Sequence, residues 1–259
     1  MPMNAKLRLL QSSSWLKRAG RSTLGLVFPE CCELCQISLP SLENAEDAIG
    51  LCESCRLLLL NDDREACLGC GCPVGPYLLT QTSCLKCQRA AYKFHQVIRL
   101  GLYQDELRSA IIKGKAPAEK SLCVALARYL ALVQRERLEA VAADVVVPVP
   151  SFWLKRIYAP HHQADILAEV IAHELQLPLR LAAIHKVRRT ADQSDLPREQ
   201  RLRNLNGAFR VPLRRAISGR TVLLVDDVLT TRTTANECAR ALRKAGAKRV
   251  VVAAIAAVE

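Results

Sequence analysis

The sequence is poor in aromatic residues and has no long hydrophobic run. Only 4% of its 259 residues are Phe, Trp or Tyr, which argues against a stacking platform for single-stranded nucleic acid. The apolar stretch 250–258 is about half the length that a transmembrane helix needs, so we expect no membrane span. The first 30 residues have scattered basic side chains and lack the continuous apolar segment of a signal peptide. We therefore expect a cytoplasmic protein.

Cysteine, in contrast, is abundant and regularly spaced. Eight of the twelve cysteines form four Cys-x-x-Cys pairs, all before residue 90: Cys32/Cys35, Cys52/Cys55, Cys67/Cys70 and Cys84/Cys87. A gap of two residues lets both thiolates of a turn face one metal ion, and without an export signal metal binding is favoured over disulfides. The other four are expected to be thiols without a role: Cys31, Cys72, Cys123 and Cys238.

The spacing between the pairs predicts two closed metal sites. Sixteen residues separate the first pair from the second, and 13 separate the third from the fourth. Each two consecutive pairs suit a tetrahedral four-cysteine zinc ribbon, so we expect about two Zn²⁺ ions. Four protein ligands leave no open position, which indicates a structural role. A cross-braced arrangement of the first pair with the third stays open, as do an iron–sulfur cluster and redox dithiols.

The chain is predicted to have three parts. Residues 1–30 form a basic arm, residues 31–90 a double four-cysteine module, and residues 96–259 an α/β domain. The cysteine module has too little hydrophobic core to fold without metal. Half of all residues are hydrophobic, which is enough for a sizeable core in the third part.

Hydrophobic periodicity after residue 95 predicts alternating strands and helices. Strands are expected at 97–103, 144–149, 179–184, 208–211, 221–225 and 249–256, and helices at 105–112, 119–137, 163–175 and 234–245. Residues 185–205 are polar and are expected to form a long loop. This alternation is typical of a mainly parallel sheet flanked by helices.

Positive charge is concentrated in the predicted α/β domain. Residues 1–95 carry a net charge of +1 and residues 96–259 carry +11, with 11 basic and 3 acidic residues in 180–220 alone. A phosphate-rich partner is expected to bind near that segment. The alternative is a solvated basic surface that keeps the protein soluble.

The strongest functional signal is the segment 221–234. A predicted buried strand delivers two adjacent carboxylates, Asp226 and Asp227, at its carboxyl end. The turn before the next helix contains Thr230, Thr231, Arg232, Thr233 and Thr234. Backbone N–H groups and the dipole at a helix N-terminus bind phosphate, and two carboxylates can accept hydrogen bonds from neighbouring sugar hydroxyls. The segment therefore predicts a sugar-phosphate site, against the alternative of a threonine N-cap beside two incidental acids.

This segment resembles the phosphoribosyl-pyrophosphate (PRPP) motif of type I phosphoribosyltransferases. From about Phe28 to the C-terminus the chain is similar to the ComF family of competence and gluconate-utilisation proteins. Besides the cysteine pairs, the resemblance rests on Phe28-Pro29, Leu107-Arg108, Ile111-Ile112-Lys113, Pro148-Val149-Pro150, Thr190, Gln193, Leu196, Arg201, Asn204 and Gly207-Ala208-Phe209.

The resemblance implies a type I phosphoribosyltransferase-like fold and roles for individual residues. Asp226 and Asp227 would hold the ribose hydroxyls of PRPP, with Mg²⁺ bound alongside. The 5′-phosphate would lie among Thr230, Thr231, Thr233 and Thr234. The segment where such folds have a loop that closes over pyrophosphate contains Lys186, Arg188, Arg189 and Gln193.

Two positions depart from the family pattern. Arg232 replaces a glycine of the phosphate loop, so it is expected either to strain the loop, at about 1–2 kcal/mol for a left-handed residue, or to contact a phosphate through its guanidinium. The segment 159–163 replaces the family's Arg-Gly-Phe-Asn-Gln near pyrophosphate and keeps only Gln163. His161 and His162 then either supply the lost cation at low pH or are exposed residues at a helix start.

Two functions follow from these observations. The first is an enzyme that displaces pyrophosphate from PRPP with Mg²⁺, which the intact Asp226-Asp227 pair favours. The second is a non-catalytic adaptor that binds a phosphorylated ligand or single-stranded DNA alongside competence proteins during DNA uptake, which the two altered loops favour. The sequence identifies no protein nucleophile, no acceptor and no oligomeric state.

Overall fold

The computed structural model describes residues 30–39, 49–62, 64–75, 84–151, 162–187 and 207–259. The chain divides into two compact units, 1–55 and 56–259. The predicted basic arm lies outside the described residues except for Glu30. No helix in the described part of the chain combines the length and the hydrophobicity that crossing a membrane requires.

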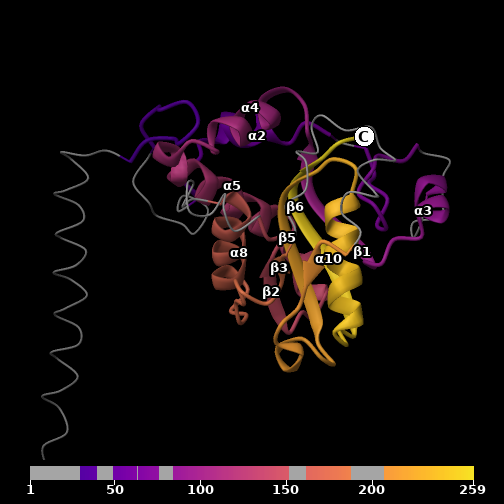
Figure 1. Cartoon of the computed structure of the whole chain (residues 1–259). Helices are drawn as coiled ribbons and strands as arrows, with labels where there is room; N and C mark the ends of the chain where they lie inside the picture. Colours follow the sequence, from indigo (N-terminus) through magenta and orange to yellow (C-terminus); the bar gives the residue numbers. More distant parts are fainter. Residues whose placement is uncertain (1–29, 40–48, 63, 76–83, 152–161, 188–206) are drawn as a thin grey trace, which may run out of the picture. The chain divides into compact units, whose positions relative to one another are not determined.

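A four-stranded parallel sheet forms the centre of the unit 56–259. Its strands are β1 (Gln96–Leu102), β2 (Val145–Pro148), β5 (Thr221–Leu229) and β6 (Arg249–Ala257), in the order β1-β6-β5-β2 (Figure 1). All three pairings are parallel. Nearly every residue of the two central strands is buried, as expected for a parallel sheet covered on both faces, and this explains their continuous hydrophobic sequences. The predicted α/β class is confirmed.

Helices cover the two faces of this sheet. Helices α5 (Lys120–Val133) and α8 (Gln163–Glu174) pack together, and α8 contacts β2 and β5. Helix α10 (Thr233–Lys244) packs against the opposite face (Figure 1). Cys238 and Leu242 of α10 share a buried cluster with Val222 and Leu224 of β5. Leu223 is also fully buried and points to the other face, because successive side chains of a strand alternate.

Shorter elements complete the described chain. They are α2 (Glu53–Leu59), α3 (Leu85–Ala90), α4 (Asp105–Lys113), the 3₁₀ turn Pro117–Glu119, α6 (Arg135–Ala140), the antiparallel pair β3 (His185–Lys186) and β4 (Phe209–Arg210), and the 3₁₀ turn Arg214–Ala216. The long helix predicted at 119–137 is therefore two helices, which break at Gln134 because its backbone is not helical.

The strand predicted at 179–184 is wrong. Only Leu179 pairs, through a single parallel bridge with Val146 of β2, and a turn follows. Alanine occupies two of the six positions and disfavours a strand, while Ala183 and Ile184 reach the core from the turn. Extended structure resumes at His185 and Lys186, which were expected to belong to the long loop. Residues 188–206 of that loop lie outside the described residues.

Strand β5 is four residues longer than predicted. It continues past Val225 to Leu229, and Asp226 pairs with Ala254 of β6 within the sheet. The two acidic residues are therefore part of the strand, and the turn into α10 begins only at Thr230.

Candidate functional site

The acidic pair lies on β5 with its carboxylates tied to the backbone. The Asp227 N–H donates to Asp226 Oδ1 at 3.0 Å, and the Val228 N–H donates to Asp227 Oδ1 at 2.9 Å. Asp226 is buried, whereas Asp227 is half-buried. Burial and the neighbouring Asp227 carboxylate raise the pKa of Asp226 well above its usual value. Two carboxyl groups side by side can both accept hydrogen bonds from hydroxyls of a ligand.

The end of α4 contributes a cation to this pair that sequence reasoning missed. Lys115 Nζ lies 3.7 Å from Asp227 Oδ2 and forms an ion pair with it. Gln163 fixes the end of α4, because its Nε2 donates to the Ile111 carbonyl at 3.0 Å. Lys115 follows the family motif Ile111-Ile112-Lys113 by two residues, and Gly114 between them is the signal that the helix ends there.

The turn from β5 into α10 has the features of an anion cradle. Arg232 precedes the first residue of α10 with a left-handed backbone, φ 60° and ψ 2°. The first N–H groups of a helix have no partner inside it and, with the helix dipole, attract anions. Thr231 Oγ1 is buried and has no hydrogen-bond partner among the described residues. An unpaired buried hydroxyl beside a helix N-terminus is what a bound phosphate would satisfy.

The side chain of Arg232 is turned into the protein instead of toward the cradle. It is 7% exposed, and its guanidinium donates to the carbonyls of Thr230 and Cys70 and to Cys72 Sγ. The left-handed backbone expected at this position is confirmed. The sequence predicted that Arg232 either strains the loop or contacts a phosphate through its guanidinium. In the structure the guanidinium instead hydrogen-bonds to the Thr230 and Cys70 carbonyls and to Cys72, which joins the turn to the second cysteine cluster. The expectation of a thiol without a role is consequently wrong for Cys72.

The basic loop is described only at its start. Lys186 is half-buried in β3. Burial and the Asp226 carboxylate raise the pKa of the Cys238 thiol, whereas the positive charge of Lys186 lowers it. The charges of Lys186 and Asp226 therefore both influence the pKa of the same buried thiol, that of Cys238. Arg188, Arg189 and Gln193 lie outside the described residues, as does His161.

The eight paired cysteines form two groups of four. They are Cys32, Cys35, Cys52 and Cys55 in one unit, and Cys67, Cys70, Cys84 and Cys87 in the other. Within each group the sulfur atoms all lie within 4.8 Å of one another. Cys35 and Cys52 of the first group are 3.6 Å apart, and three pairs of the second group are 3.5–3.8 Å apart. A tetrahedral ion with Zn–S bonds of about 2.3 Å requires sulfurs about 3.8 Å apart, so the groups fit such a metal. The sequential pairing is confirmed, and the cross-braced alternative is wrong.

The thiols of one group differ widely in pKa. Burial acts to raise the pKa of Cys32, but hydrogen bonds from the backbone of Cys35, Cys52 and Leu34 lower it to about 6. Burial and the neighbouring thiols Cys52, Cys35 and Cys32 raise the pKa of Cys55. Burial raises the pKa of Cys87 to about 12, with a further contribution from Cys67. Thiols gathered this closely resist losing protons together, and a bound metal ion supplies the positive charge that stabilises their thiolates.

Both clusters begin with the same turn. In the second, the Cys67 N–H donates to the Cys72 carbonyl at 2.8 Å, and the N–H of Gly71 donates to the Cys67 carbonyl at 2.7 Å. The segment 32–37 repeats this pattern. The fifth residue of each turn is left-handed, with φ 63° at Gln36 and 72° at Gly71. The first turn accommodates a side chain at this position, Gln36, whereas the second has no room for one: a Cβ added at Gly71 would lie 2.7 Å from the Val97 side chain.

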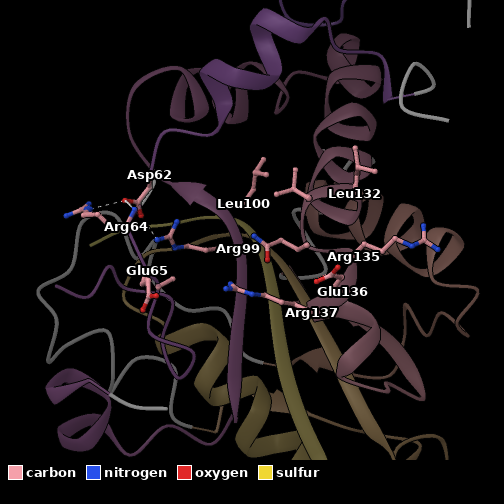
Figure 2. Close-up of a pocket in the computed structure, with 12 residues that line it drawn as sticks. Asp62, Arg64, Glu65, Arg99, Leu100, Leu132, Arg135, Glu136 and Arg137 are labelled. Atoms are coloured by element: carbon pink, nitrogen blue, oxygen red, sulfur yellow. Dashed lines mark hydrogen bonds and ion pairs between the residues drawn. The ribbon is translucent and has the colours of Figure 1, made fainter. Parts of the chain in front are cut away.

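A cavity of ≈ 620 Å³ lies elsewhere in the unit 56–259 (Figure 2). Its lining includes Asp62, Arg64 and Arg99 at one end and Arg135 and other residues around the α5–α6 junction at the other. It is lined neither by the acidic pair nor by the turn between β5 and α10, Thr230–Arg232, which is called the phosphate turn below. Arg99 donates to Asp62 Oδ2 at 2.5 Å, so the charge at that end is largely neutralised within the protein. The cavity is therefore not the sugar-phosphate site.

A parallel sheet with two acids on a central strand and a threonine turn at the next helix defines a phosphoribosyltransferase-type domain. Residues 157–259 match the family described as phosphoribosyl transferase domain. The DNA utilization protein YhgH of Salmonella typhi is 30% identical over 88% of this chain and 96% of its own length. Competence protein F of Haemophilus influenzae is 28% identical over 78% of this chain and 88% of its own. The chain belongs to the ComF family.

Solved structures are similar over a smaller part of the chain. A phosphoribosylpyrophosphate synthetase from Mycobacterium smegmatis aligns with 49% of this chain and 32% of its own, at 26% identity and a TM-score of 0.33.

Proposed function

We propose that the carboxyl end of β5 binds PRPP or a closely related sugar phosphate and serves transfer of its phosphoribosyl group. The observation that supports this most is the arrangement of Asp226 and Asp227 near the end of β5, two residues before a turn in which Thr231 Oγ1 is buried and unpaired at the N-terminus of α10. The acids provide acceptors for two ribose hydroxyls, and the turn provides donors for the 5′-phosphate.

Each group then has a role in the transfer. A nitrogen or other nucleophile of the acceptor forms a bond to the anomeric carbon while the bond from that carbon to pyrophosphate breaks, and the electron pair leaves with pyrophosphate. The chain positions the ribose and stabilises charge, so no protein nucleophile is needed. Lys115, 3.7 Å from Asp227, keeps positive charge next to the ribose and phosphates. A bound Mg²⁺ would neutralise part of the pyrophosphate charge.

The cysteine clusters have a structural role in this proposal. We expect one Zn²⁺ in each, because four thiolates at tetrahedral spacing close the coordination sphere. Neither cluster then has a position for a substrate, and the acidic pair is the place where the chemistry occurs.

Binding of PRPP tests the proposal. Titration calorimetry of the full chain should detect PRPP binding that is stronger with Mg²⁺, and the double variant Asp226→Asn with Asp227→Asn should lose it while the protein stays folded. Glu106→Gln, an exposed acid on α4, is the matched control and should bind as the wild type does. Release of pyrophosphate with a panel of nucleobases and amines then identifies the acceptor. Absence of PRPP binding to the wild type under both conditions contradicts the proposal.

A second function, an adaptor for single-stranded DNA in DNA uptake, is favoured by the names of the relatives. The chain resembles proteins named for DNA utilization and for competence, and its 96–259 part carries a net charge of +11. Binding to such DNA should weaken steeply with salt and show little sequence preference. Reversing the charges of Arg188 and Arg189 should weaken it more than substitutions in residues 36–51. The opposite ranking would place the DNA site on the first cysteine cluster.

A further inference from the structure

Arg232 connects the phosphate turn to the second cysteine cluster. Its guanidinium Nη1 donates to the Thr230 carbonyl at 2.9 Å, inside the turn. On the other side, Nε donates to the Cys70 carbonyl at 3.1 Å and Nη2 to Cys72 Sγ at 3.1 Å. The planar fork of an arginine holds several acceptors in fixed directions. One buried side chain therefore fixes the phosphate turn relative to a metal-ligand turn that is 160 residues away in the sequence.

The cluster turn that Arg232 contacts is also fixed from the side of the sheet. Arg99 Nε donates to the Gly71 carbonyl at 2.6 Å, and the Val97 N–H donates to the Leu68 carbonyl at 2.8 Å. Both donors belong to β1. The acceptors of Arg232 therefore have a defined position as long as residues 67–72 keep their turn.

A second connection reaches the same end of α10. The Lys93 N–H, just after the fourth cysteine pair and α3, donates to Asn236 Oδ1 at 2.7 Å. Asn236 is in the first turn of α10, and its own N–H donates to the Arg232 carbonyl at 2.9 Å. Cys72, which follows the third cysteine pair, and Lys93, which follows the fourth, are thus both hydrogen-bonded to residues at the N-terminal end of α10, where the phosphate would bind.

The shape of the cluster turn depends on what holds its sulfurs together. Cys67 and Cys70 are buried and contribute two of the four sulfurs, and the N–H of Cys84 donates to Cys67 Sγ at 3.3 Å. A metal ion would fix all four sulfurs at once, and its loss would release them. The Cys70 carbonyl and Cys72 thiol that Arg232 contacts belong to that turn, so they would move with it.

We propose that Arg232 is a positioning residue that couples metal binding at Cys67, Cys70, Cys84 and Cys87 to anion binding at the β5–α10 turn. The metal keeps the acceptors of Arg232 in place, and Arg232 keeps its left-handed backbone, which gives the turn the geometry to receive a phosphate. Coupling of two binding sites is reciprocal, so a phosphorylated ligand in the turn retains the metal more firmly. The identity of that ligand rests on the proposed function.

Release of metal from the full-length protein measures this coupling without any ligand. Zinc-loaded protein is mixed with excess chromogenic chelator, and zinc transfer is followed by absorbance. Arg232→Gly, which permits the same backbone, should speed the release of one of the two zinc ions by about fivefold or more and leave the other unchanged. Cys72→Ala should speed the same phase and serves if the glycine variant does not fold. Lys244→Ala, an exposed residue at the other end of α10, should change neither rate. Equal rates in Arg232→Gly, Cys72→Ala and the wild type would overturn the inference.

Addition of PRPP with Mg²⁺ gives the second part of the test. It should slow the same phase of zinc release in the wild type and have no effect on that phase in Arg232→Gly. Calorimetry that shows PRPP binding to the wild type, together with an unchanged release rate, would overturn the coupling and leave the proposed function standing. No PRPP binding in calorimetry would overturn the proposed function, and the ligand-free rates then decide whether Arg232 holds the cluster.

Discussion

Lys115 Nζ lies 3.7 Å from Asp227 Oδ2, which brings the end of α4 to the acidic pair of β5. The two residues are far apart in the sequence, and the last turn of α4 is hydrogen-bonded to α8, because Gln163 donates to the Ile111 carbonyl. The ion pair partly neutralises the acidic pair, which has to receive a negatively charged ligand under the proposed function.

Lys115→Ala is expected to weaken PRPP binding about fivefold. The side chain is 54% exposed, so water screens its charge and the contribution is on the order of 1 kcal/mol. Lys113→Ala is the control, because Lys113 is two residues away and its ammonium pairs with Glu119 instead. Calorimetry of both variants measures the difference. Equal loss in the two would mean that only the overall charge of the segment matters.

Asp226→Asn is expected to stabilise the free protein at neutral pH. The folded-state pKa of Asp226 is raised by burial and by Asp227, so the folded protein holds this proton more tightly than the unfolded chain does. The associated stability is fully present below the unfolded pKa, near 3.8, and is lost as pH rises through the folded pKa. Asparagine keeps the acceptor for the Asp227 N–H and carries no charge.

Urea unfolding at pH 5 and pH 8 measures this effect. The gain in the free energy of unfolding from Asp226→Asn should be larger at pH 8 than at pH 5. A gain that shrinks as the pH rises would show that Asp226 is not held in its neutral form by the fold.

The protein is expected to contain about two zinc ions per chain. Cys52→Ser should remove one and leave the unit 56–259 folded, because Cys52 belongs to the cluster of the unit 1–55. Cys84→Ser should remove the other and lower the stability of the unit 56–259, because that cluster is hydrogen-bonded to β1 and α10. Elemental analysis and thermal unfolding check both results. Iron in place of zinc, or no metal, would contradict the expectation.

Gly71→Ala is expected to destabilise the unit 56–259 by about 1–3 kcal/mol. Its φ of +72° is unfavourable for alanine, and the added Cβ would lie 2.7 Å from Val97 Cγ1. Gly75→Ala is the matched control, because no atom lies within 4 Å of its added Cβ. Urea unfolding compares the two variants, and equal stability would show that the turn adapts at no cost.

The sequence was sufficient to predict the four strands of the central sheet and to place Asp226 and Asp227 near the end of one of them. Central parallel strands are buried on both faces, so β5 and β6 appear as uninterrupted hydrophobic segments that need no tertiary information to be found. The strand predicted at 179–184 was wrong, because only Leu179 pairs with β2, and Arg180 and two alanines interrupt the hydrophobic run.

The cysteine spacing predicted two groups of four thiols, because a gap of two residues places two thiols on one turn whatever surrounds them. Which pairs combine was decided only by the tertiary structure, through the sulfur positions. The same holds for Arg232. Its replacement of a glycine was visible in the sequence, and its left-handed backbone followed from that position. The direction of its guanidinium depends on Cys70 and Cys72, more than 150 residues away, and local sequence contains no information about contacts at that separation.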